Sequence, residues 1–265
     1  MFAGFAKRAA PIAALAMSVG LSGCWVPGSS NWERVDGVPL AELDTSGDAP
    51  DTIWLAGPDK VVITEGDTLS ITLDGDAEAG EAMRFEREGS RLSIARDSEV
   101  YDGRGEAIIR ITMPAAANLE IAGSGEIEAD TVASTAELEI AGSGDITVAN
   151  VDSESLEVEI AGSGDVQAAG RTQRLSVEIA GSGNVDLSEM MSDDVDVEIA
   201  GSGDVRLASN GTVDASIAGS GNVTVIGSAS CSVTSAGSGS LTCRPAATAS
   251  ADEATEVAET DAAEE

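Results

Sequence analysis

Ile160-Ala161-Gly162-Ser163-Gly164-Asp165-Val166 is one copy of the motif that decides the fold. Its centre, Ala-Gly-Ser-Gly, occurs seven times, in copies that begin at Ala122, Ala141, Ala161, Ala180, Ala200, Ala218 and Ala236. The steps between copies are 19, 20, 19, 20, 18 and 18 residues. A fixed period near 20 residues is typical of chains whose repeats stack on one another as successive coils. We therefore expect an all-β stacked coil over the repeat tract, residues 118–244.

Apolar residues alternate with polar ones on both sides of each turn. In six copies an Ile precedes the tetrapeptide, and in the seventh Ser235 takes its place. The positions two and four residues before that Ile, and the second and fourth residues after the tetrapeptide, form four further columns of Val, Leu, Ile, Ala or Cys. Alternation of this kind predicts strands that bury one side. We expect each repeat to hold two short strands and two turns, stacked in parallel into a β-helix-like coil with two main sheets. A three-faced coil remains an alternative for the two shortest repeats.

The paired glycines of each copy predict the turn itself. Only Gly adopts positive φ without cost, and a tight stack leaves no room for Cβ atoms at a corner. The turn-forming residues on this interpretation are Gly123, Gly125, Gly142, Gly144, Gly162, Gly164, Gly181, Gly183, Gly201, Gly203, Gly219, Gly221, Gly237 and Gly239.

Acidic residues dominate the polar positions, and the formal net charge of the chain is −33. Such a surface repels nucleic acid, so we expect no nucleic-acid partner. One outward column before the turn holds Glu120, Glu139, Glu159, Glu178 and Glu198. A second column after the turn contains Asp145, Asp165 and Asp204, which are weak candidates for Ca²⁺ because that ion prefers carboxylate oxygens. The first column is also a candidate surface for divalent cations, and the alternative for it is a solvated acidic face. The alternative for the second column is that its Asx side chains cap their own turn.

The sequence carries no signature of catalysis, and we expect no enzyme, no catalytic residue and no cofactor, with Ca²⁺ alone left open. The chain has no His, so no imidazole can activate the serines of the Gly-Ser-Gly turns. A polysaccharide-active β-helix enzyme that uses paired carboxylates is the alternative from another class.

The N-terminus predicts export and a lipid anchor. Residues 1–23 combine the basic pair Lys7 and Arg8 with a short apolar run that ends in Leu21-Ser22-Gly23-Cys24. That ending resembles the bacterial lipoprotein box, in which Cys24 would become the first residue and carry acyl chains such as palmitate. Trp25 rather than Asp follows Cys24, which by the same resemblance favours the outer membrane of the bacterial cell envelope. The alternative is an ordinary signal peptide with a chance Cys.

Two further segments and a pair of cysteines remain to be interpreted. Residues 24–48 are rich in Gly, Ser, Pro and Asp and read as a flexible tether, and residues 246–265 read as a disordered acidic tail without bases. Between them, Cys231 and Cys243 fall in apolar columns of the last repeat, on its two different strands. In an exported protein this predicts a disulfide that closes the final coil, with two buried thiols as the alternative.

Three segments together resemble the bacterial head GIN domain family of auto-transporter adhesins. They are Gly57-Pro58-Asp59-Lys60-Val61-Val62-Ile63, then Ala107-Ile108-Ile109-Arg110-Ile111-Thr112-Met113-Pro114, and then the Ile-Ala-Gly-Ser-Gly repeats. The resemblance covers residues 49–245. It implies a right-handed β-superhelix similar to that of pectin lyases, no catalytic residues, and an adhesin-like or structural role toward an unknown envelope or extracellular ligand.

Overall fold

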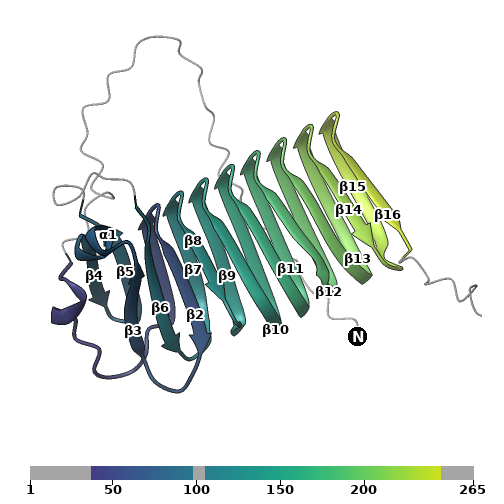
Figure 1. The fold of residues 1–265 in the computed structure, drawn as a ribbon. Coiled ribbons are helices and arrows are strands. Elements are labelled where there is room, and N and C mark those ends of the chain that lie inside the picture. Colours follow the sequence, from purple (N-terminus) through teal and green to yellow (C-terminus); the bar gives the residue numbers. More distant parts are fainter. Residues whose placement is uncertain (1–36, 98–104, 246–265) are drawn as a thin grey trace, which may run out of the picture. The chain divides into compact units, whose positions relative to one another are not determined.

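A computed structural model describes residues 37–97 and 105–245, which form a parallel β-solenoid (Figure 1). In the repeat tract each coil runs from one Gly-Ser-Gly turn to the next. The strands of the tract are β7 (Ala116–Gly123), β8 (Glu126–Ala129), β9 (Val132–Gly142), β10 (Asp145–Gly162), β11 (Asp165–Gly181), β12 (Asn184–Gly201), β13 (Asp204–Gly219), β14 (Asn222–Ile226), β15 (Ser230–Gly237) and β16 (Ser240–Arg244). All of them pair in parallel, with the repeats in register, so the prediction of an all-β stacked coil is confirmed.

The far side of each coil differs from the prediction, because the middle repeats have no second turn. Strands β10 to β13 are 16–18 residues long and run without a break from one Gly-Ser-Gly turn to the next. Each bends at an irregularity in its pairing, for example between Val148 and Val151 of β10. A bulge bends a strand while the hydrogen-bond ladder continues on either side. The two faces of the coil therefore belong to one 16-stranded sheet that folds around the core.

The N-terminal region, which we call the cap, supplies two more coils and a layer that covers them. Its elements are η1 (Leu40–Glu42), β1 (Thr52–Gly57), β2 (Lys60–Glu65), β3 (Ser70–Gly75), α1 (Ala77–Glu81), β4 (Met83–Glu88), β5 (Arg91–Arg96) and β6 (Ala107–Met113). The coil of β1 and β2 lies between that of β5 and β6 and that of β7 and β8, so the order along the stack differs from the order in the sequence. Strands β3 and β4 add antiparallel edges beyond β6 and β5.

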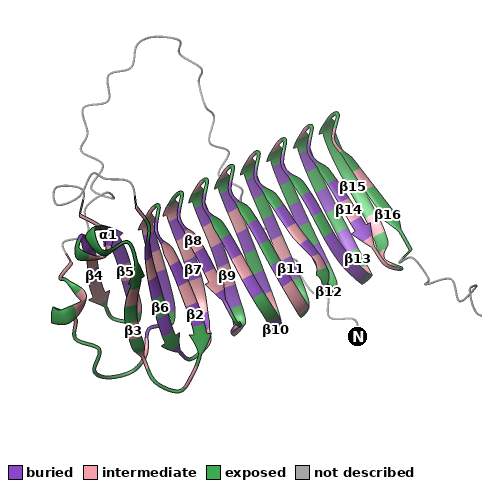
Figure 2. Cartoon of the chain, in the orientation of Figure 1, coloured by how far each residue is buried: buried purple, intermediate pink, exposed green. Residues whose placement is uncertain are grey.

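The core is a set of apolar columns that run along the inside of the stack. Ile140, Ile160 and Ile179 lie opposite one another in register and are buried, and the other predicted columns behave alike. Buried and exposed residues alternate along the strands of the middle coils, β10 to β13 (Figure 2). One position in these columns differs from the prediction. Ala117 was expected to be buried, but the pairing of β7 shifts after Ala116, so that Ala116 is buried in its place.

Part of the predicted tether packs against the first coils instead. Val38 and Phe85 exchange two backbone hydrogen bonds of 2.9 and 2.8 Å, and Leu40 and Leu43 contact the core. The tether prediction is thus wrong for residues 37–48, because their few apolar side chains cover the outer face of the cap. The segments 1–23, 24–36 and 246–265, with Cys24, lie outside the described residues.

The last coil ends in the predicted disulfide between Cys231 and Cys243, which is confirmed. The two cysteines occupy the columns of Val213 and Val225 in the preceding coil. Since no further coil covers them, Cys231 is only partly buried and Cys243 is exposed, although both lie in inward columns. In the described part of the chain, no helix is long and apolar enough to cross a membrane.

Candidate functional site

The corners of the coils set the spacing of everything on the surface. At the turn of residues 162–164, Gly162 has φ +146°, a region that L side chains rarely adopt. A Cβ on Gly164 would overlap the carbonyl oxygen of Gly144 and lie 2.7 Å from Cγ2 of Ile140 in the preceding coil. Between them, the backbone N–H of Ser163 donates to the Gly142 carbonyl at 2.8 Å. The serine side chain is exposed on the edge of the stack, and its amide carries this hydrogen bond.

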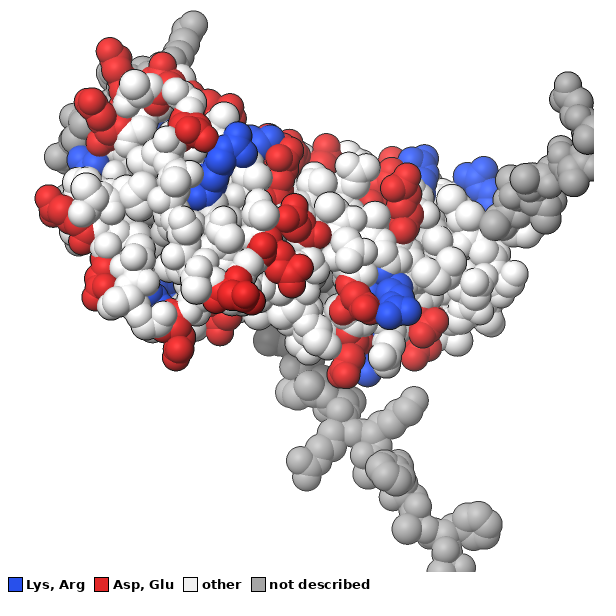
Figure 3. Space-filling model, turned by 60° about the horizontal axis from the view of Figure 1, so that its bottom comes forward, with Lys and Arg blue, Asp and Glu red and all other residues white. Residues whose placement is uncertain are grey.

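The outward side chains of the strand that precedes each turn form a surface that we call the acidic face. Its Glu column comprises Glu120, Glu139, Glu159, Glu178 and Glu198, which lie directly opposite one another in register. A second acidic column, two residues earlier in each strand, comprises Glu137, Glu157, Asp196 and Asp214, with Ser176 between the second and third. Acidic side chains outnumber basic ones on the side of the solenoid shown in Figure 3.

Stacking changes the titration of these carboxylates. Partial burial first, and like-charged neighbours second, raise the pKa of Glu137, Glu159, Glu178 and Asp196 above the ordinary value. Burial also raises the pKa of Glu120, and the attraction of Arg91 opposes that rise. The acidic face therefore holds repulsion between neighbours that a bound cation or a proton would relieve.

One end of the acidic face is covered by an arginine and a tryptophan that the sequence did not single out. The Arg91 guanidinium lies 5.8 Å from the centre of the Trp54 ring and forms an ion pair with Glu120. Trp54 pairs with Ser93 on one side and with Glu120 on the other, so the arginine spans the tryptophan to reach the glutamate. No local pattern predicts this contact, because it depends on the position of β1 between β5 and β7.

A column of Asp and Asn after each turn, which we call the Asx column, links successive coils through hydrogen bonds. It comprises Asp145, Asp165, Asn184, Asp204 and Asn222. Oδ1 of Asp165 accepts from the backbone N–H and the side-chain amide of Asn184, at 3.1 and 2.8 Å. Oδ1 of Asp204 accepts the same two bonds from Asn222, both at 2.9 Å. The expectation that these side chains cap their own turn is therefore wrong, because the acceptors reach the following coil.

The calcium candidates Asp145, Asp165 and Asp204 belong to this column. Oδ1 of Asp145 accepts the backbone N–H of Asp165 at 3.2 Å, and Asn184 separates Asp165 from Asp204 in register. Across residues 37–97 and 105–245, no three acidic or Cys side chains converge in a way that could hold a metal ion.

The acidic face ends in a shallow hollow over the last coils, which we call the alanine groove. Its floor is the outward column Ala180, Ala200, Ala218 and Ala236, and its volume is about 310 Å³. Glu178 and Glu198 lie on one side of it. In the next two coils the Glu column continues as Ser216 and Thr234, so the glutamates of this column end partway along the groove.

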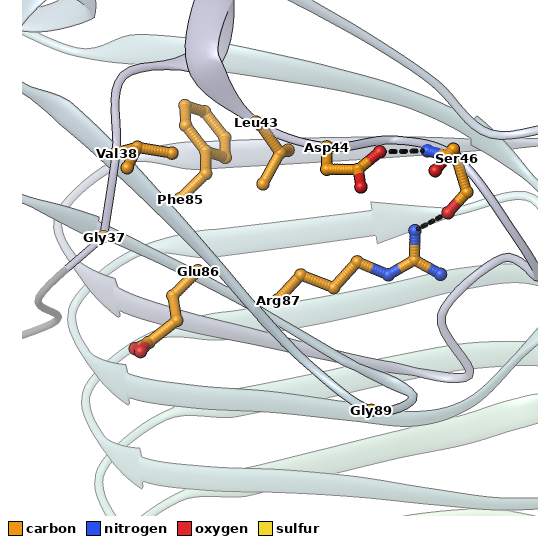
Figure 4. Close-up of a pocket in the computed structure, with 9 residues that line it drawn as sticks. All are labelled: Gly37, Val38, Leu43, Asp44, Ser46, Phe85, Glu86, Arg87 and Gly89. Carbon is orange, nitrogen blue, oxygen red and sulfur yellow. Dashed lines mark hydrogen bonds between the residues drawn. The ribbon is translucent and has the colours of Figure 1, made fainter.

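A second hollow, of about 450 Å³, lies at the cap (Figure 4). Arg87 extends along it and donates to the carbonyl oxygen of Ser46 at 3.0 Å, while Asp44 accepts the Ser46 backbone N–H at 2.9 Å. A hydrogen bond from Ser46 lowers the pKa of Asp44. These polar groups bind the segment that packs on the cap.

A buried ion pair fixes the first corner of the stack. Asp59 is fully buried and accepts from Arg96 Nε at 3.1 Å and from the Ala107 backbone N–H at 2.8 Å. Arg96 also donates to the carbonyl oxygen of Gly105 at 2.9 Å. Asp59 thereby joins the coil of β1 and β2 to the coil of β5 and β6. A Gly-Pro-Asp turn was the only sequence signal for this residue.

Two of the arginines in the repeat tract, Arg171 and Arg206, lie beside acidic neighbours. Nε of Arg171 lies 2.8 Å from Asp152, and Nη1 of Arg206 lies 3.7 Å from Asp186. The sequence predicted no catalytic residue. The serines of the turns are exposed and follow one another from coil to coil along the edge of the stack.

Comparison with solved structures finds a similar fold in other bacterial proteins. An adhesin of Bacteroides fragilis, described as putative, superposes with a TM-score of 0.68 and 18% identity over 74% of this chain and 93% of that one. A "putative lipid binding protein" of Parabacteroides distasonis gives a TM-score of 0.59 and 22% identity over 74% and 93%. An adhesin of Parabacteroides merdae, also described as putative, gives 0.58 and 16% over 74% and 92%. At these identities the likeness concerns the fold.

Comparison with curated proteins finds no match. Comparison with family models matches residues 49–229 to "Putative auto-transporter adhesin, head GIN domain". The matched region includes the cap from β1 onward and six of the seven Gly-Ser-Gly turns, and it stops just before β15, so the disulfide coil lies beyond it. Because the match spans more than half of the sequence, the chain belongs to the head GIN domain family.

Proposed function

We propose that this protein is an adhesin-like binding module of the bacterial cell envelope, held there by lipid on Cys24. The observation that carries the binding role is the register of the acidic face. Glu139, Glu159 and Glu178 recur directly opposite one another from coil to coil. Such a surface offers one chemical pattern many times over a flat area, which suits attachment to an extended partner.

The uniformity of the acidic face argues against the alternative of a polysaccharide-active enzyme. Hydrolysis by two carboxylates needs one kept protonated and the other ionised, in different environments. Burial and like charges raise the pKa of both Glu159 and Glu178, which lie opposite one another, so this pair of carboxylates has no division of roles. The adhesin names of similar folds support the same conclusion.

The anchor rests on the sequence alone, since Cys24 follows an export signal with a lipoprotein box. Several acyl chains on one residue suffice for stable membrane attachment. With Trp25 next to Cys24, we propose the outer membrane as the location of the protein.

Two measurements on Cys24→Ser test the proposal. The variant should leave the membrane fraction and carry no acyl group, and it would contradict the anchor if it still sedimented with membranes after a carbonate wash. The soluble variant, labelled, should then bind saturably to envelope fragments or to the surface of other cells. Linear, non-saturable uptake in both assays would remove the binding role. Bovine serum albumin serves as the control for passive adsorption, because it also is acidic.

A further inference from the structure

The alanine groove combines an apolar floor with a charged rim on one side only. Ala180, Ala200 and Ala218 are exposed, and each extends a single methyl group from the sheet. The Ile residues between them and the rim, such as Ile199, are buried in the core, so the floor is rigid. Glu178 and Glu198 stand along one margin, and Ser216 and Thr234 supply hydroxyl groups over the last two coils.

We propose that the alanine groove binds a basic polypeptide segment of a partner protein, one that carries Lys or Arg beside short apolar side chains. This inference rests on the binding role proposed above and names the class of partner and its place on the solenoid. The short side chains would pack on the alanine methyl groups, and the cationic groups would reach the glutamates of the rim.

Charge complementarity is what selects this partner. Among the described residues, neither Glu178 nor Glu198 takes part in an ion pair with a basic group of its own chain. The nearby arginines of the tract, Arg171 and Arg206, are engaged by Asp152 and Asp186. Burial and the adjacent Glu198 raise the pKa of Glu178, so an incoming cation would relieve existing repulsion.

The same argument disfavours the two occupants that this chain could supply itself. A second copy would bring another acidic face against this one, in a molecule whose net charge is already −33. The segment 246–265 contains Asp and Glu but no Lys or Arg, so the rim would repel it. A basic segment from another protein is the occupant that both the floor and the rim favour.

The test is fluorescence anisotropy of a short labelled peptide in which Lys and Ala alternate, titrated with the full chain carrying Cys24→Ser. The filled-groove variant Ala200→Trp leaves the net charge unchanged, and Ala141→Trp is its control, two coils beyond the groove on the same column. The rim variant Glu178→Gln with Glu198→Gln is matched by Asp145→Asn with Asp204→Asn, which removes the same charge from the Asx column. A peptide in which Glu and Ala alternate controls for packing in the absence of cationic side chains.

We expect both groove variants to weaken peptide binding roughly tenfold at about 0.15 M salt, since two partly exposed charge pairs are lost or displaced. The control variants should bind as the parent does. Equal effects of groove and control variants would overturn the proposal, since they would indicate diffuse attraction to an acidic protein. Binding of the Glu-Ala peptide would also overturn it. If Ala200→Trp still binds envelope fragments saturably while the Lys-Ala peptide shows no preference, the groove is wrong and the binding module stands.

Discussion

The two glycines of each turn are required for different reasons, and this difference is visible at single residues. Gly162 needs its backbone conformation, with φ +146°, whereas Gly164 needs the absence of a side chain. The carbonyl oxygen of Gly144 and the Cγ2 atom of Ile140 occupy the place of any Cβ on Gly164. Both atoms belong to the coil below, so the repeat spacing itself depends on these glycines.

Gly164→Ala should therefore destabilise the solenoid severely, by about 2–4 kcal/mol, because overlap with a backbone oxygen cannot be relieved by a side-chain rotation. Urea denaturation followed by circular dichroism measures the change in midpoint. Ser163→Ala is the matched control in the same turn, and its exposed side chain should shift the midpoint little. Equal midpoints for the two variants would show that the corners are looser than described.

Asp59 carries the buried charge of the first corner, and its removal leaves Arg96 without that partner. We expect Asp59→Asn to lower the free energy of unfolding by about 3–5 kcal/mol, because breaking a buried, hydrogen-bonded ion pair is costly. Asp74→Asn is the control, since the Asp74–Arg110 pair is more than half exposed on both sides. The control should cost under about 1 kcal/mol in the same chemical denaturation. A small effect at Asp59 would mean that the corner does not depend on this ion pair.

At the scale of the element, the Glu column makes stability depend on pH. Folding raises the pKa of Glu137, Glu159, Glu178 and Asp196, so the folded state binds protons more tightly than the unfolded chain does. This contribution is fully present below the ordinary pKa of these groups and is lost as pH rises through the folded values. The melting temperature should accordingly rise as pH falls from 7 toward 5.

Other carboxylates act in the opposite direction at lower pH. A hydrogen bond from Lys60 lowers the pKa of Glu128, and one from Arg171 lowers the pKa of Asp152. Their stabilisation is lost as pH falls through those lowered values, so the gain should reverse in stronger acid. Glu159→Gln should flatten the rise between pH 7 and 5. A melting temperature that falls steadily from pH 7 downward would contradict this account of the acidic face.

The terminal coil depends on its disulfide, because nothing covers it. In Cys231→Ser with Cys243→Ser, amide hydrogens of β15 and β16 should exchange much faster, while those of β10 and β11 keep their protection. The closed loop is short, since the cysteines are 12 residues apart, so the overall loss should be at most about 3 kcal/mol. Hydrogen exchange with mass spectrometry separates local fraying from global unfolding. Uniform loss of protection along the stack would show that the end coil stabilises the whole solenoid.

Much of the solenoid is predictable because its periodicity is local. The alternation around each Gly-Ser-Gly places Ile160 and Val166 in the core and Glu159 outside, and the column argument gives the disulfide. The bends could not be predicted, because a bulge such as that at Val148 needs no special residue. The position of β1 between β5 and β7 depends on pairing far along the chain. Consequently the Arg91–Glu120 and Asp59–Arg96 contacts could not be predicted from neighbouring residues in the sequence.

For the molecule as a whole, the central claim is that the acidic face is the surface that binds. Saturable binding of the soluble Cys24→Ser chain to envelope fragments should be compared between two variants with equal charge change. One neutralises the acidic face with Glu139→Gln, Glu159→Gln and Glu178→Gln, and the other neutralises the Asx column on the opposite side of the coil with Asp145→Asn, Asp165→Asn and Asp204→Asn. We predict that the first loses most of its binding and the second keeps it. Equal binding by the two would contradict the claim.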